Sequence, residues 1–94
     1  MDKTELKPNL KIKNPNIHET SFVARGAQII GDVTLEKDSS VWYNSVLRAD
    51  INKITIGKRT NIQDNSVVHL ENDQGVYVGD DVTVRAFVTE YNGS

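Results

Sequence analysis

The chain has 94 residues, of which 37% are hydrophobic and 26% are charged, and its formal net charge is −2. This length allows one small domain with a modest core, and the weak negative charge gives no reason to expect nucleic acid or an anionic membrane as a partner. The sequence contains no cysteine, which excludes disulfides and cysteine-based zinc sites. It also has no apolar run long enough for a membrane helix or a secretory signal, so we expect a cytoplasmic protein.

Residues 1–20 show no regular alternation of apolar and polar side chains. This stretch contains both prolines of the chain and several asparagines, which favour turns and irregular backbone. We predict that residues 1–20 form a lead-in strand or a cover over the start of the domain. His18 lies here among polar residues and is interpreted as a solvated loop histidine.

A six-residue repeat begins at Val23. Helical periodicity is nearly absent, and short runs rich in valine, isoleucine and threonine alternate with glycine, asparagine and aspartate, as in short strands joined by tight turns. The repeat slips by three residues near residue 53 and is interrupted by an insertion around residues 71–75. Its first position always holds valine, isoleucine or leucine: Val23, Ile29, Leu35, Val41, Leu47, Ile56, Ile62, Val68, Val78 and Val84.

This period predicts an all-β fold, a parallel β-solenoid of about three to four coils over residues 21–94. Each unit is one short strand and a turn, so three units make a triangular coil of about 18 residues, and stacked coils lie ~4.8 Å apart. First-position side chains then form apolar ladders inside the prism, and the residue after each one points outward. A small antiparallel sandwich is the alternative, which the repeat neither excludes nor explains. The outward set includes Trp42, Arg48, Gln63 and His69.

Several polar residues on the predicted outer surface are candidates for a site. Arg48 and Asp50 lie two apart on one face of a strand. Gln63 precedes His69 by one repeat, which predicts that their side chains lie on adjacent faces near a shared edge. An imidazole there is a candidate metal ligand or acid–base group, and a glutamine amide can hold a bound water. The plainer interpretations are a surface ion pair for Arg48 and Asp50, and turn formation for Asp64.

The motifs of the central region resemble a known family. Residues 39–69 read "SSVWYNSVLRADINKITIGKRTNIQDNSVVH" and residues 76–84 read "VYVGDDVTV". Over roughly residues 20–84 this string resembles the gamma-class carbonic anhydrase-like family of hexapeptide-repeat proteins. The resemblance implies a left-handed β-helix that assembles as a homotrimer with zinc between subunits, where a zinc-bound hydroxide converts carbon dioxide to bicarbonate. The left hand is taken from the resemblance alone, because parallel crossovers are usually right-handed.

The resemblance also implies a role for each matching residue. His69 corresponds to the first of three zinc-binding histidines. Gln63 would hydrogen-bond the zinc-bound water, and Asp64 would belong to the same polar network. Arg48 and Asp50 would tie neighbouring subunits together, a role that suits a bidentate contact between arginine and a carboxylate.

The chain departs from the family pattern after Val84. The other two histidines belong to a motif of the form "VTVGHxxxxHGC", whereas this chain reads "VTVRAFVTEYNGS". Arg85 stands in place of the glycine, and Ala86 and Tyr91 stand in place of the histidines. The family continues for further coils and ends in a helix, so the chain resembles the N-terminal portion of a member, with a tail at 85–94 that departs from the pattern. Because one suitable imidazole does not complete a three-histidine site, we expect no carbon dioxide hydration.

Two other functions are compatible with the repeat. Hexapeptide-repeat proteins include acyltransferases that use coenzyme A, but these need a catalytic histidine on a protruding loop, and the insertion "LENDQG" at residues 70–75 has none. A non-catalytic β-helix scaffold would use only the faces of the prism. An open solenoid end is a template for pairing with another chain, so we expect self-association rather than a monomer.

Overall fold

The computed structural model describes residues 14–69 and 75–85, and the regular structure of these residues is entirely β-strand. The all-β prediction is therefore confirmed. No helix in this described part is long and apolar enough to cross a membrane. In chain order the strands are β1 (Asn16–Ile17), β2 (Phe22–Val23), β3 (Gln28–Leu35), β4 (Ser40–Val41), β5 (Val46–Ile56), β6 (Asn61–Ile62), β7 (Val67–His69), β8 (Val76–Val78) and β9 (Thr83–Val84).

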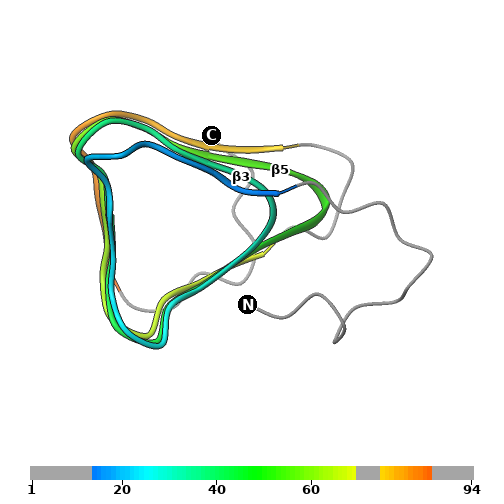
Figure 1. Ribbon diagram of the computed structural model, residues 1–94, viewed down its shortest axis with the longest axis horizontal. Coiled ribbons are helices and arrows are strands. Elements are labelled where there is room, and N and C mark those ends of the chain that lie inside the picture. The colour runs from blue at the N-terminus through cyan, green and yellow to red at the C-terminus, as the bar shows by residue number, and fades with distance from the viewer. Residues whose placement is uncertain (1–13, 70–74, 86–94) are drawn as a thin grey trace.

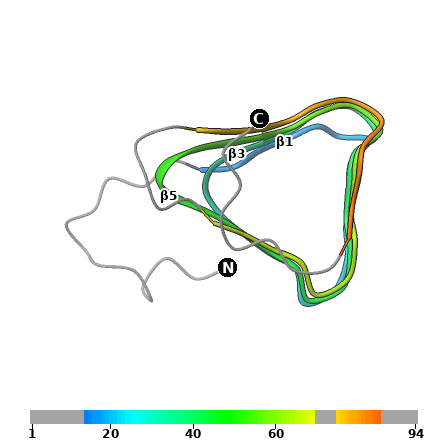
Figure 2. The ribbon, with the colours of Figure 1, turned by 180° about the vertical axis from the view of Figure 1, so that it is seen from behind.

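The described strands pair in parallel and form two sheets. The first has the order β1-β3-β5-β7, with β8 also paired to β5, and the second has the order β2-β4-β6-β9. The long strands β3 and β5 bend around a corner, so the first sheet covers two faces of a triangular prism and the second covers the third (Figure 1). Seen from behind, the coils again follow one triangular outline (Figure 2). This is a parallel β-helix of about 3 turns, consistent with the left-handed winding that the resemblance implies.

The apolar ladders lie inside this prism. Val41 pairs with Ile62, which pairs in turn with Val84. Of the other predicted first positions, Ile29 is partly buried and packs against the core, as Val84 does. The inward orientation that the repeat predicted is confirmed. The predicted positions exposed by 2% or less are Leu35, Val41, Leu47, Ile56, Ile62, Val68 and Val78.

The slip of three residues in the repeat is a bulge at one corner of the prism. Gly31 in β3 lies opposite Ala49 in β5, but Val33 lies opposite Ile54, so β5 has three extra residues at this corner. Gly31 has a φ of 85°, and a side chain there would collide with the backbone of Ala49. After the bulge Ile54 points into the core with 0% exposure, together with Val76 of the next coil. The six-residue pattern missed both residues because it skipped the stretch in which the register changes.

The segment before residue 21 also contributes to the prism. Its strand β1 pairs in parallel with β3. His18 follows β1 and is exposed, with its Nδ1 2.9 Å from Thr20 Oγ1. The predicted cover over the first coil falls largely on residues 1–13, which lie outside the described residues.

A second corner, here called the Gln63 corner, is built from three stacked turns: 24–27, 42–45 and 63–66. In each turn the N–H of the fourth residue donates to the carbonyl of the first, at 3.1 to 3.3 Å. The third residue has a positive φ of 81°, 60° and 60° at Gly26, Asn44 and Asn65 respectively. Glycine and asparagine tolerate this conformation best, and type II turns require it at their third position. The turn residues of the repeat therefore set this corner.

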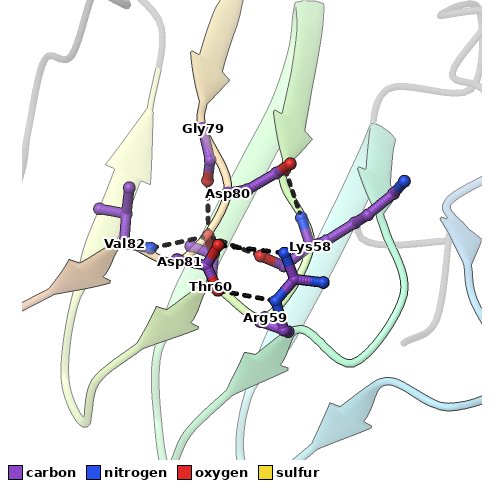
Figure 3. A network of polar contacts seen from close by, with 7 residues as sticks. All are labelled: Lys58, Arg59, Thr60, Gly79, Asp80, Asp81 and Val82. Carbon is purple, nitrogen blue, oxygen red and sulfur yellow. Dashed lines mark hydrogen bonds and ion pairs between the residues drawn. The ribbon is translucent and has the colours of Figure 1, made fainter.

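The remaining corner, here called the Thr60 corner, contains a buried hydroxyl between two coils. Thr60 is fully buried, and its Oγ1 donates to the carbonyl of Gly79 at 2.5 Å and accepts from the N–H of Val82 at 3.2 Å (Figure 3). Both backbone groups belong to the turn of the following coil. The hydroxyl thus satisfies polar groups that the turn would otherwise bury without a partner.

An exposed ion pair lies on the outside of the same corner. Arg59 has a φ of 55°, a conformation that non-glycine residues rarely adopt. Its Nε and Nη2 donate to the two carboxylate oxygens of Asp81 at 2.7 and 3.0 Å (Figure 3). This hydrogen bond and the charge of Arg59 lower the pKa of Asp81. The stabilisation is present at neutral pH and is lost on acidification as Asp81 is protonated, and it is weak because both side chains are exposed.

We predict that the core depends on the ladder residue Leu47. Leu47→Ala leaves a cavity between coils that the backbone ladder holds apart, so the free energy of unfolding should fall by about 2–5 kcal/mol. Ile17→Ala is the matched control, because Ile17 is 42% exposed and its loss should cost less than about 1 kcal/mol. Urea unfolding followed by circular dichroism measures both values. Equal losses in the two variants would contradict the inward position of Leu47.

We also predict that the hydroxyl of Thr60 stabilises its corner. Thr60→Val keeps the shape of the side chain but leaves the Gly79 carbonyl and the Val82 N–H without this partner, so unfolding should become easier by about 1–3 kcal/mol. Thr55→Val is the control, since Thr55 is half-buried on β5 and its hydroxyl bonds no other described residue. The same urea experiment applies. An unchanged stability of Thr60→Val would show that water replaces the hydroxyl.

Candidate functional site

Arg48 and His69 meet on the outer side of the first sheet. β5 and β7 pair in register, so Arg48 lies directly opposite His69. Arg48 Nη2 is 2.7 Å from His69 Nε2. A guanidinium group only donates hydrogen bonds, so Nε2 is the acceptor and the neutral imidazole carries its proton on Nδ1. The nitrogen of His69 that faces this surface is therefore already occupied by a cationic donor.

Asp50 is the third member of this cluster. Its Oδ2 lies 3.7 Å from Arg48 Nε, which is an ion pair but is too long for a hydrogen bond. Its Oδ1 is buried and has no hydrogen-bond partner among the described residues. The side chain of Arg48 is 45% exposed and that of Asp50 is 24% exposed. The two residues thus contact each other within one chain, and their predicted contact with a neighbouring subunit stays a prediction.

The described residues of one chain do not fit a zinc ion at His69. A catalytic zinc site needs three protein ligands. Within residues 14–69 and 75–85, no three histidine, aspartate or glutamate side chains come together as a metal-binding group. The Nε2 atom of His69 faces a guanidinium, which repels a second cation. Ala86 and Tyr91, which stand where the family has histidines, lie outside the described residues.

Gln63 and Asp64 lie at a different corner from His69. They begin the last turn of the Gln63 corner and line an open hollow of about 670 Å³, together with Thr83 and Arg85. His69 does not line it. The turn ends at Ser66 and β7 then crosses the face for three residues, a distance of about 10 Å. Gln63 directly follows β6 of the second sheet and His69 ends β7 of the first, so the two residues lie on the two faces that meet at this corner, and the proximity of their side chains stays a prediction.

The sequence interpretation missed Thr83 and Arg85 as lining residues. The N–H of Gln63 donates to the carbonyl of Val84 at 2.9 Å, which brings β9 beside β6. Arg85 therefore lies one coil after Gln63 in the same outward column. The spacing of one coil was the available signal, but Arg85 was considered only as a replacement for the family glycine.

Sequence comparisons identify relatives of the chain, although no family model matches it. It is 46% identical to the mitochondrial gamma carbonic anhydrase 2 of Arabidopsis thaliana over 81% of this chain and 30% of that protein. It is 50% identical to a probable carbonic anhydrase of Methanocaldococcus jannaschii, over 66% of this chain and 39% of that protein. The chain belongs to the gamma carbonic anhydrase-like family.

Other members of this family carry other names. An uncharacterized transferase of Bacillus subtilis, YtoA, is 40% identical over 84% of this chain and 46% of its own length. The chain thus spans less than half the length of each of these relatives. Membership of the gamma carbonic anhydrase-like family alone does not show what this chain does.

We predict that Arg48 sets the tautomer of His69. In Arg48→Ala the Nε2 atom loses its donor, so the neutral imidazole should shift toward the form protonated on Nε2. Long-range ¹⁵N–¹H NMR spectra at alkaline pH, where imidazoles are neutral, distinguish the two tautomers. His18 serves as the internal control, because it lies before β2 and should not change. An unchanged His69 spectrum in Arg48→Ala would contradict the contact.

Proposed function

We propose that the chain is a subunit of a homotrimeric, gamma carbonic anhydrase-like assembly and does not hydrate carbon dioxide by itself. The contact of Arg48 Nη2 with His69 Nε2 is the observation that carries this proposal. His69, which the resemblance implies is the first zinc ligand, here accepts a hydrogen bond from a cation. The relatives named carbonic anhydrases supply the expected reaction, the conversion of carbon dioxide to bicarbonate.

The distribution of polar groups supports a ring of identical subunits. Gln63 and Asp64 lie near one end of a prism face, and His69 with Arg48 lies near the other. A contact between two different patches of the same chain is head-to-tail, and it closes into a ring when the rotation between subunits allows. In such a ring the Gln63 corner of one subunit meets the His69 end of its neighbour. This arrangement fits the trimer that the family resemblance implies.

Arg48 and Asp50 fit the interface role that the resemblance implies. Arg48 uses one Nη2 hydrogen for His69, and its guanidinium has further donors on the exposed half of the side chain. Asp50 Oδ2 pairs with Arg48 Nε at 3.7 Å and so holds the guanidinium beside β5. The exposed donors of Arg48 suit a polar contact across a subunit interface.

The number of imidazoles supports the proposed lack of activity. The whole sequence has two histidines and no cysteine. His18 is engaged with Thr20 near the start of the prism, so His69 is the suitable imidazole of the described residues. A three-histidine zinc site within or between copies of this chain would need two more such ligands at the same place. For location we propose the cytoplasm, and the mitochondrial relative makes that organelle the alternative to test.

Metal analysis tests this proposal directly. The purified chain should contain well under one zinc per chain after incubation with zinc and desalting, because it offers too few ligands. Stopped-flow measurements should show no carbon dioxide hydration above the metal-free rate. Stoichiometric zinc that is lost in His69→Ala would overturn the proposal, because it would show that a complete site forms around His69.

A restored variant provides the matching positive control. Arg85→Gly, Ala86→His and Tyr91→His together supply the family's missing glycine and imidazoles, and this variant should gain zinc if copies of the chain assemble as proposed. Sedimentation velocity on both proteins measures assembly separately from metal content. A monomeric chain would exclude the homotrimer, whatever its zinc content.

A further inference from the structure

We infer that the hollow at the Gln63 corner binds a small zwitterion of the α-amino acid type. Four polar side chains from two successive coils line it: Gln63, Asp64, Thr83 and Arg85. The hollow has a volume of about 670 Å³ and is open to solvent, so a small polar ligand would stay partly hydrated in it. The inference shares Gln63 and Asp64 with the proposed function but requires neither zinc nor His69.

The side chains that line the hollow are free to bind a ligand. Asp64, Thr83 and Arg85 are exposed and Gln63 is half-buried. The side chains of these four residues form no hydrogen bond or ion pair with any other described residue. This differs from the Thr60 corner, where the exposed Arg59 is held by Asp81 through two hydrogen bonds. The guanidinium of Arg85 and the carboxylate of Asp64 thus line the same hollow without an ion pair between them.

The chemistry of these groups selects a ligand with both charges. Arg85 presents a planar fork of donors that matches a carboxylate. Asp64 accepts hydrogen bonds and attracts an ammonium group. The amide of Gln63 and the hydroxyl of Thr83 can each donate and accept. An α-amino acid carries a carboxylate and an ammonium group close together, so it can satisfy both charges at once, whereas a simple anion leaves Asp64 unpaired and repelled.

Trp42 provides a natural reporter for this hollow. Its backbone N–H donates to the carbonyl of Ile62, so it lies one coil before Gln63 in the same outward column, and its indole N–H donates to Ser40 Oγ at 2.9 Å. Its ring contacts that of Tyr43 edge-on, with centroids 6.0 Å apart. Trp42 is the single tryptophan of the chain, so its indole signal can be assigned without ambiguity.

Titration with three matched small molecules tests the inference on zinc-free protein. Glycine carries both charges, acetate carries only the carboxylate, and methylammonium carries only the cation. ¹H–¹⁵N NMR spectra should show saturable shifts at Gln63, Asp64 and the Trp42 indole with glycine, at millimolar concentration as expected for so small a ligand. Acetate and methylammonium should bind at least about tenfold more weakly, because each leaves one charge of the hollow unpaired.

Charge-neutralising variants assign the binding to the hollow. Arg85→Gln and Asp64→Asn should each weaken glycine binding by about tenfold or more. Lys37→Gln and Glu19→Gln are the controls, since both residues are exposed in turns of another corner and should leave binding unchanged. Glycine binding is measured on zinc-free protein, so its outcome is separate from the zinc content that tests the proposed function. Equal binding of acetate and glycine, or no saturable shift up to about 100 mM glycine, would overturn the inference.

Discussion

The pairing of each coil with the next, through parallel backbone hydrogen bonds, is the interaction on which the rest of this protein depends. A single six-residue unit cannot bury its own apolar side chain. Val41 becomes inaccessible to water only because Ile62 lies beside it in the following coil, and Leu47 depends on Val68 in the same way. The core is therefore a set of ladders rather than a central cluster, and its stability is a sum over contacts between neighbouring coils.

The buried side-chain hydroxyl groups of Ser45 and Thr60 lie at corners of the prism, where they hydrogen-bond to the backbone of turns. Ser45 Oγ donates to the carbonyl of Gln63 at 2.6 Å and accepts from the N–H of Ser66 at 3.2 Å, as Thr60 does for the turn of the coil after it. These hydroxyls replace the water that a tight turn would otherwise require. The corners are thus held by the same coil-to-coil contacts as the faces.

This construction also determines what the outer surface can do. Residues one coil apart in an outward column lie next to each other, so Arg48 meets His69, and Arg85 lies beside Gln63. Residues of one coil on different faces are placed by the turn between them, as Gln63 and His69 are by the turn at 63–66.

The sequence by itself determined the fold class, the inward ladders and the family. Both the strict six-residue period and the ordered motifs can be recognised from the order of residues alone, without any distance in space. It did not reveal that Ile54 and Val76 join the core, because a bulge changes the register in a stretch to which the six-residue pattern assigns no inward position. It also overlooked Arg85 as a neighbour of Gln63. Only the tertiary structure decided these points, because the spacing of residues along a strand is local, whereas the length of each corner sets which residues of successive coils lie side by side.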